Sequence, residues 1–192
     1  MTSIEFVGYH DTMITDQERE TALALLARSR GVVLKAIEGV TESQARWKPT
    51  PERWSILEYV EHLAVSDDAL VALVKRTLES PARAETTEER SAREQKIRET
   101  PVPRGVNRAP EHLKPVARFN TLAEAVSAFL AARERTVEYA RSTADDLRKH
   151  FAPHPVLGSL DGFQWLCGNA RHAESHAAHV VEIRGMPDFP QV

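Results

Sequence analysis

Residues 161–187 read DGFQWLCGNARHAESHAAHVVEIRGMP, and this stretch contains the signals for both ends of one long helix. Asp161 followed three positions later by Gln164 matches a capping box, which satisfies backbone N–H groups at a helix start. The cation Arg184 stands in the expected last turn, and Pro187 beyond it cannot continue a helix. The sequence therefore predicts a helix from 161 to 184.

Three other segments start with the same signal, a hydroxyl residue with glutamate three positions on. The pairs are Thr15 with Glu18, Ser55 with Glu58, and Thr121 with Glu124. Apolar residues follow each pair at helical spacing. We therefore expect helices over 15–39, from 55 to about 79, and from 121 to about 140.

The long connection between the second and third of these helices spans residues 80–120. It contains five prolines and the charged run TTEERSAREQKIRE at 86–99, which predicts a solvated face with at most a short helix. About forty residues are more than a tight turn needs, so the two helices are free to run parallel through a crossover. No strand pattern is evident, and the Pro-rich segment after the third helix is interpreted as a loop.

These elements predict an all-α fold, a four-helix bundle formed by one domain over 1–192. Residues 1–14 form an N-terminal tail, and 80–120 form the crossover connection. The segment 41–53 is a connector in which Trp47 is expected to pack over one end of the bundle.

Composition excludes several classes of protein. The 192 residues are 42% hydrophobic and 28% charged, as in an ordinary globular domain. With 25 Lys and Arg against 28 Asp and Glu the net charge is −3, so no basic field favours nucleic acid. The single Cys167 excludes an intramolecular disulfide and a cysteine-based zinc cluster. No signal peptide or membrane-spanning run is evident, and we expect a cytoplasmic protein.

The histidines of 161–184 gather on one side of the predicted helix. At 100° per residue a sector roughly 80° wide contains Trp165, Asn169, His172, His176, His179 and Ile183. His172 and His176 are about 6 Å apart along the axis, a spacing that allows two imidazoles to chelate one ion. His179 is about 10.5 Å from His172 and does not easily join both on that ion.

An HxxxH pair by itself is more often exposed or structurally bonded than metal-binding. His62, however, lies on the inward side of the second helix, and packing that helix against 161–184 would bring a third imidazole to the pair. Three histidines with open coordination positions are typical of a catalytic metal site. The remaining histidines, His10, His112, His150 and His154, are expected to be solvated residues of the tail and loops.

Three sharper motifs do not fit. The segment HAESH at 172–176 resembles a zincin helix, but Glu174 would point about 160° away from the histidines. A di-iron carboxylate bundle needs Glu-x-x-His pairs, and no histidine here follows a glutamate at that spacing. Cys167 projects about 140° away from His172, which disfavours both a cysteine ligand to the same ion and a Cys-His dyad. Cys167 is therefore expected to be a small buried apolar residue.

The two segments ERWSILEYVEHLAVSDD at 52–68 and WLCGNARHAESHAAHVVEIR at 165–184 together resemble the DinB/YfiT-like superfamily. The shared elements are WS-x-x-E-x-x-x-H-L and H-x-x-x-H-x-x-H/Q-x-x-x-I. The resemblance implies a four-helix bundle in up-down-down-up order and a divalent metal held by His62, His172 and His176. It places His179 beside the site, at a position that is commonly His or Gln, and not among the ligands.

The resemblance implies activity less directly. Some relatives resemble transferases and isomerases that use a bacillithiol- or mycothiol-like thiol, and an open metal position would hold such a thiol as thiolate. A hydrolase that uses the same metal to activate water is the alternative, and a non-enzymatic metal- or small-molecule-binding bundle is a third hypothesis. Zinc, nickel, iron and copper all suit three imidazoles. The resemblance implies a small-molecule substrate and, since related bundles often pair, a homodimer, which this chain's residues by themselves neither favour nor oppose. No nucleic-acid or membrane partner is expected.

Overall fold

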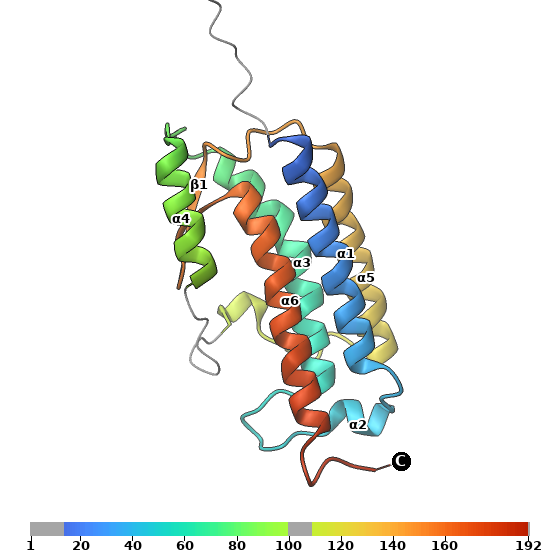
Figure 1. The fold of residues 1–192 in the computed structure, drawn as a ribbon. Coiled ribbons are helices and arrows are strands. Elements are labelled where there is room, and N and C mark those ends of the chain that lie inside the picture. Colours follow the sequence, from blue (N-terminus) through green and yellow to red (C-terminus); the bar gives the residue numbers. More distant parts are fainter. Residues whose placement is uncertain (1–13, 100–108, 192) are drawn as a thin grey trace, which may run out of the picture.

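The computed structural model describes residues 14–99 and 109–191, and its elements are mostly helical (Figure 1). The helices are α1 (Asp16–Ile37), α2 (Glu42–Arg46), α3 (Ile56–Leu78), α4 (Thr87–Glu99), the 3-10 helix η1 (Glu111–Leu113), α5 (Leu122–Ser142) and α6 (Gly162–Arg184). Two short strands, β1 (Phe151–His154) and β2 (Gly158–Asp161), precede α6. No helix within the described ranges is long and apolar enough to cross a membrane.

Helices α1, α3, α5 and α6 form a four-helix bundle with the up-down-down-up order. α1 packs most extensively against α6, and α3 against α5. The two members of each pair run in the same direction, and the two pairs run in opposite directions (Figure 1). α3 and α5 are parallel, as the length of the 80–120 connection allows, and the described parts of that connection include α4 and η1.

The predicted helix starts are present, with one difference in detail. Complete capping boxes open α1, α3 and α6. At α5 the Thr121 hydroxyl accepts from the backbone N–H of Glu124, but the Glu124 carboxylate accepts from the N–H of Asn120 instead of Thr121. The four helices therefore begin where the sequence pattern places them.

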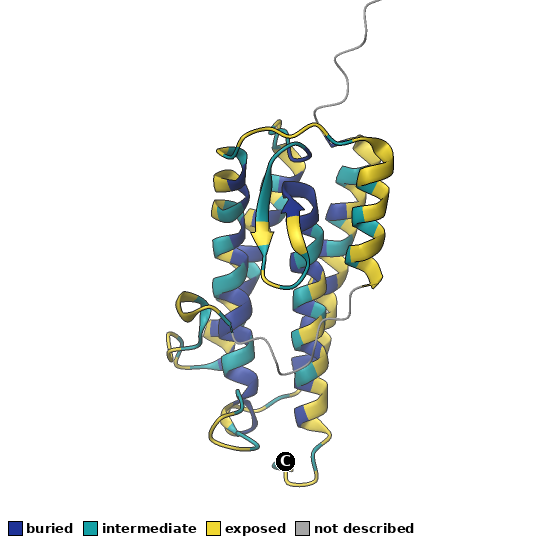
Figure 2. Ribbon diagram, turned by 90° about the vertical axis from the view of Figure 1, so that its left-hand side faces the viewer, coloured by how far each residue is buried: buried dark blue, intermediate teal, exposed yellow. Residues whose placement is uncertain are grey.

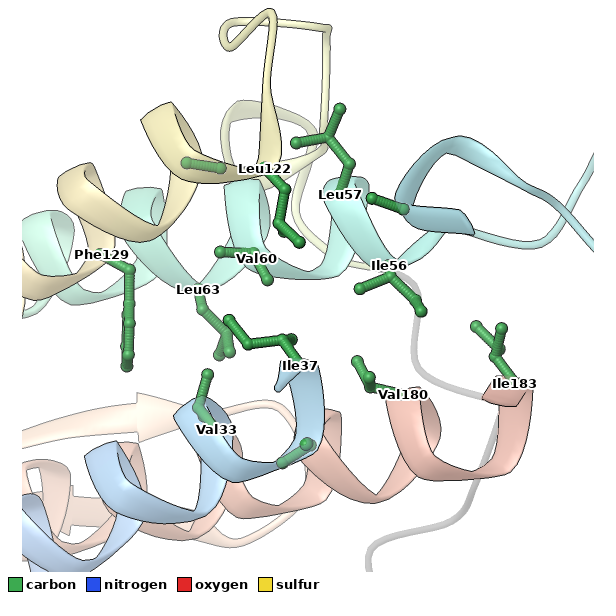
Figure 3. Close-up of a cluster of buried hydrophobic side chains, with 14 of the residues drawn as sticks. Val33, Ile37, Ile56, Leu57, Val60, Leu63, Leu122, Phe129, Val180 and Ile183 are labelled. Carbon is green, nitrogen blue, oxygen red and sulfur yellow. The ribbon is translucent and has the colours of Figure 1, made fainter. Parts of the chain in front are cut away.

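The buried apolar residues form two clusters, one toward each end of the bundle. The first joins the end of α1 to the start of α3, the start of α5 and the second half of α6 (Figure 3). The second joins the start of α1 to the ends of α3 and α5 and the first half of α6. Along α1, α3 and α5 the buried polar residues Ser29, Asp67, Arg133 and Thr136 lie between the two clusters.

The connector between α1 and α3 contains a helix that the sequence analysis did not predict. α2 has its own capping box, formed by Thr41 and Gln44. Trp47, at its end, packs edge-on against Phe189 with ring centroids 5.6 Å apart. Trp47 thus packs at one end of the bundle, as expected.

The absence of strands was a wrong prediction. β1 and β2 pair antiparallel, with Phe151 opposite Asp161 and His154 opposite Gly158 (Figure 2). Each strand has only four residues, which is too short to show an alternating pattern, and β1 includes Pro153. Leu160 is 1% exposed. The hairpin is therefore stabilised by packing against the bundle and not by an intrinsic preference of its residues for strands.

The charged run of the crossover forms α4, which has no buried residue. The run is solvated as expected, but it forms a helix of 13 residues and not a short one, and this helix docks through polar groups. Arg93 pairs with Glu85 and, at 3.3 Å, with Asp161 at the start of α6. Arg148 pairs with Glu94 of α4 at 3.1 Å and with Asp161 at 2.8 Å.

Candidate metal centre

Three histidine side chains meet where α3 faces α6. His62 comes from α3, and His172 and His176 come from successive turns of α6. The Nε2 atom of His172 lies 3.1 Å from Nε2 of His62 and 2.9 Å from Nε2 of His176. One ligand atom from each of the three residues lies within 4.8 Å of the others. Three imidazole nitrogens therefore converge on one point.

The spacing of these nitrogens fits one metal ion. Two nitrogens bound at about 2.1 Å to one ion are about 3.0 Å apart at a right angle and about 3.4 Å apart at the tetrahedral angle. Nε2 of His172 carries at most one proton, which forms a linear hydrogen bond to only one of the two nitrogens 2.9 and 3.1 Å away, whereas an ion accepts a lone pair from all three. The donor set suits a divalent transition metal such as zinc, nickel or iron.

Burial keeps the three imidazoles in the form that binds metal. Burial, and then the adjacent His62, lowers the pKa of His172 to about 3. Burial also lowers the pKa of His62 and of His176, and in His176 the neighbouring His172 adds to the effect. All three rings are therefore neutral at pH 7, with a lone pair available on each.

The crossover orients the His62 ring. Its Nδ1 donates to the backbone carbonyl of Leu113 in η1 at 2.8 Å, so the lone pair is on Nε2, the atom that faces His172. The Ser66 hydroxyl, one turn along α3, lies 3.4 Å from the same Nε2. A residue more than fifty positions away in the sequence thus sets the tautomer of His62.

Glu61 anchors the segment that carries Leu113. This carboxylate is 1% exposed and accepts from the backbone N–H groups of Val116 and Arg118 at 2.8 and 3.2 Å. It also pairs with the Arg118 guanidinium at 2.9 Å. Between the two bonded N–H groups, Ala117 has a φ of 58°, a strained value for a residue with a side chain. Glu61 therefore stabilises a strained turn next to the site.

Aromatic rings pack along one side of the histidines. Trp54 lies 4.9 Å from His62 between ring centroids, and Tyr59 lies 5.3 Å from His176. The Nδ1 atom of His176 is buried and has no hydrogen-bond partner among the described residues. Packing against Trp54 and Tyr59, and not a second hydrogen bond, therefore limits the rotation of the His176 ring.

His179 lies beside this cluster. Its ring stacks on Tyr59 with centroids 5.6 Å apart, and its centroid is 6.0 Å from that of His176. Its Nδ1 is 3.6 Å from Glu182 Oε2, and the other oxygen of Glu182 pairs with Arg53 at 3.0 Å. His179 is thus adjacent to the converging nitrogens without being one of them.

Comparisons with known proteins identify the family of this chain. The sequence profile of the DinB superfamily matches residues 25–180. This chain belongs to the DinB superfamily. It is also 26% identical over 149 residues to the uncharacterized protein YuaE of Bacillus subtilis (strain 168), covering 77% of this chain and 88% of YuaE.

A solved structure has the same fold. It is YfiT from Bacillus subtilis, described as a probable metal-dependent hydrolase with an unusual four-helix bundle topology. The TM-score is 0.58 at 17% identity, and the match covers 89% of this chain and 88% of YfiT. At that identity the likeness establishes the shared bundle, including its order of helices.

Two of the remaining histidines are not the solvated loop residues we expected. His150 Nδ1 lies 2.6 Å from the carbonyl of Ser80, so it ties the end of α3 to the segment before the hairpin. His154 Nδ1 accepts from the N–H groups of Val156 and Leu157, and its ring packs 5.1 Å from that of Trp165. His150 is bonded because its segment runs beside the end of α3, and His154 because its ring accepts from the turn of the hairpin. His112 is exposed as expected, and His10 lies outside the described residues.

The two residues that the motif analysis excluded lie away from the cluster. Glu174 points to α1, where it pairs with Arg28 at 2.9 Å. Cys167 is half-buried, and burial raises the pKa of its thiol to about 12, so it is an unreactive packing residue in this DinB-like bundle.

The sequence analysis missed Glu61, Leu113 and the packing role of Trp54 and Tyr59. An acidic residue directly before an inward histidine was a usable signal for Glu61, because a buried carboxylate needs partners. Leu113 gave no signal, since its contribution is a backbone carbonyl.

Proposed function

We propose that this protein is a metal-dependent hydrolase of a small molecule, with His62, His172 and His176 holding one divalent ion. The observation that carries the proposal is the convergence of three neutral Nε2 atoms from two helices. Three protein ligands leave coordination positions for water and substrate, which distinguishes catalytic from structural sites. The description of YfiT as a probable metal-dependent hydrolase supports the same reaction class.

A bound divalent ion supplies Lewis acidity, which activates water and polarises a carbonyl oxygen. The residues around the cluster supply the proton chemistry. Glu182 beside Nδ1 favours a proton on that atom of His179, which leaves Nε2 with a lone pair. We assign His179 Nε2 as the acceptor of the proton that the attacking water loses.

Arg53 and Tyr59 position that base. Arg53 pairs with Glu182 and orients the carboxylate that faces His179. Stacking on Tyr59, with the two ring planes 18° apart, holds the imidazole flat against α3. The contacts of His179 with Glu182 and with Tyr59 therefore hold the ring without using Nε2.

Thiol transfer, the activity that the sequence resemblance suggested, is the competing hypothesis. A bacillithiol- or mycothiol-like thiol that binds the ion releases its proton to solvent, so this reaction depends less on a protein base than hydrolysis does, and a large effect of His179 favours hydrolysis. The expected homodimer stays a prediction.

The test is turnover of the reconstituted full chain. Protein stripped with a chelator and reloaded with zinc, nickel or iron(II) is assayed on a panel of small esters and amides without thiol. It is then assayed on electrophiles with thiol. We expect hydrolysis without thiol that is lost in His172→Ala together with the bound metal.

The matched variants are His179→Gln and His112→Gln. His179→Gln should keep its metal while kcat falls by about 10²-fold or more, the range for loss of a general base. His112→Gln should behave as wild type because that residue is exposed in η1. Conjugation of thiol to the electrophile, with no ester or amide turnover and no effect of His179→Gln, would overturn the hydrolase assignment in favour of thiol transfer.

A further inference from the structure

Gly168 lies on α6 one turn before His172 and borders unfilled space. It is half-buried, yet a Cβ added to it would meet no atom of the described residues within 4 Å, apart from its chain neighbours and the adjacent helix backbone. Residues four positions apart are neighbours on a helix, and a helical side chain leans toward the helix N-terminus. The His172 ring therefore leans toward Gly168, and the space above this glycine adjoins the histidine cluster.

α3 supplies the opposite side of this space. The Asn169 amide donates to Asp67 Oδ1 at 2.7 Å, which brings the turn of Gly168 level with the turn of Ser66. Ser66 is half-buried, and its hydroxyl lies 3.4 Å from Nε2 of His62. That nitrogen is a candidate metal ligand, so a bound ion would take up its lone pair. The Ser66 hydroxyl would then donate to another acceptor beside the cluster.

Two aromatic rings bound the space on the side away from the histidine cluster. Trp165, one turn before Gly168, packs against His154 of β1 with ring centroids 5.1 Å apart. Burial lowers the pKa of His154, so its ring is neutral at pH 7. After burial, which is the largest cause, His154 is one of the groups that lower the pKa of His172, so it lies within range of the cluster.

The lining of the space is uncharged at pH 7 among the described residues. Arg171, three positions after Gly168, is exposed and donates to the backbone carbonyl of Ile97 in α4 at 3.3 Å, so its guanidinium faces α4. The carboxylate of Asp67 is buried and pairs with Arg133 at 2.9 Å. An uncharged group therefore suits this space, because a charged one would lose hydration without gaining a partner.

We propose that the Gly168 subsite, formed by Ser66, Gly168, Trp165 and His154, binds the acyl group of the substrate. The proposal rests on the proposed function, and it names esters or amides with an uncharged acyl group about the size of a phenyl ring. The ring packs on Trp165, and the Ser66 hydroxyl donates to the carbonyl oxygen. The proposed base, His179, follows the cluster on α6 whereas Gly168 precedes it, so the acyl group leaves the side of the base open to water.

The test measures binding and does not depend on turnover. The zinc-loaded full chain is titrated by calorimetry with acetohydroxamate and with benzohydroxamate, which share a metal-binding group and differ in the group on the carbonyl carbon. Burial of the phenyl ring should make benzohydroxamate bind about ten-fold more tightly or better. 4-Carboxybenzohydroxamate should bind less tightly than benzohydroxamate, because its charge has no partner in the subsite.

Glycine variants locate the ring. Gly168→Leu fills the space, so it should reduce the preference for benzohydroxamate to about two-fold or less, while zinc content and acetohydroxamate affinity stay unchanged. Gly31→Leu is the matched control, because Gly31 lies in α1, is exposed and also has open space around an added Cβ. Leucine forms helix better than glycine, so both variants are expected to fold, and a thermal melt checks this.

The outcomes separate this proposal from the hydrolase assignment. Equal affinity for the two hydroxamates, no binding of either, or a preference that Gly168→Leu leaves unchanged would overturn the subsite, even if esters are hydrolysed. Tighter binding of 4-carboxybenzohydroxamate than of benzohydroxamate would overturn the uncharged class. A preference that Gly168→Leu removes, without hydrolysis of any ester or amide, would support the subsite and overturn the hydrolase assignment.

Discussion

Replacing His172 with alanine should reduce the acid sensitivity of the metal-free protein. The His172 pKa falls from 6.5 in the unfolded chain to about 3 in the folded one, chiefly through burial. Between these values the unfolded state binds a proton that the folded state does not, so the free energy of unfolding falls as the pH falls through this window. At pH 7 and above the imidazole is neutral in both states, and the effect is absent.

The magnitude follows from linkage. Between pH 7 and pH 5 an imidazole that protonates only in the unfolded chain removes about 2 kcal/mol of stability. His62 and His176 act in the same direction, because burial lowers their pKa values too. His172→Ala removes one of these contributions. Between pH 7 and pH 5 the variant should therefore lose about 2 kcal/mol less stability than the wild type.

The assay is urea unfolding in EDTA, followed by circular dichroism at both pH values. The variant is expected to be less stable than wild type at pH 7, because the substitution removes packing; only the change between the two pH values is compared. His112→Ala, at an exposed position, should show the wild-type change. An unaltered pH 7 to pH 5 change in His172→Ala would refute the inference that this imidazole is buried and neutral.

Three further predictions concern the surroundings of the site and the core. Glu61→Gln should lower the free energy of unfolding by about 1–3 kcal/mol and weaken zinc binding in a competition titration, because it loosens the turn that positions Leu113; unchanged zinc affinity would contradict that role. Because α4 docks through ion pairs, 1 M salt or Arg93→Ala should accelerate hydrogen exchange in α4 but not in α5, and equal acceleration in both would argue against polar docking. Phe129→Ala should cost about 3–5 kcal/mol in urea unfolding, since this ring is 0% exposed, and a loss below 1 kcal/mol would mean that the cluster is loosely packed.

The bundle could be predicted because its signals are local. A capping residue and its partner three positions on belong to the same turn, so Asp161 with Gln164 indicates a helix start wherever the helix packs. Apolar residues at helical spacing then define the face that must be buried. The spacing of His172 and His176 is equally local, because helix geometry alone places them one turn apart.

The docking of α4 and of the hairpin could not be predicted in this way. Asp161 is an N-cap in the sequence pattern, but Arg148, from before the hairpin, and Arg93, from α4, converge on it as well. His154 is a loop residue by pattern, whereas in the structure its ring packs on Trp165 because the hairpin lies against α6. Such contacts depend on which segments meet, and no local pattern encodes that.

The sequence by itself determined where the four long helices begin, which faces they bury and that two histidines share one edge of α6. Only the tertiary structure decided that His62 Nε2 faces His172, because that orientation depends on the Leu113 carbonyl of the crossover. Helix formation and capping depend on residues within one or two turns, whereas a ligand's tautomer and direction depend on partners brought close by folding. For that reason the sequence identified the histidines, and the packing of α3, α6 and the crossover made them converge.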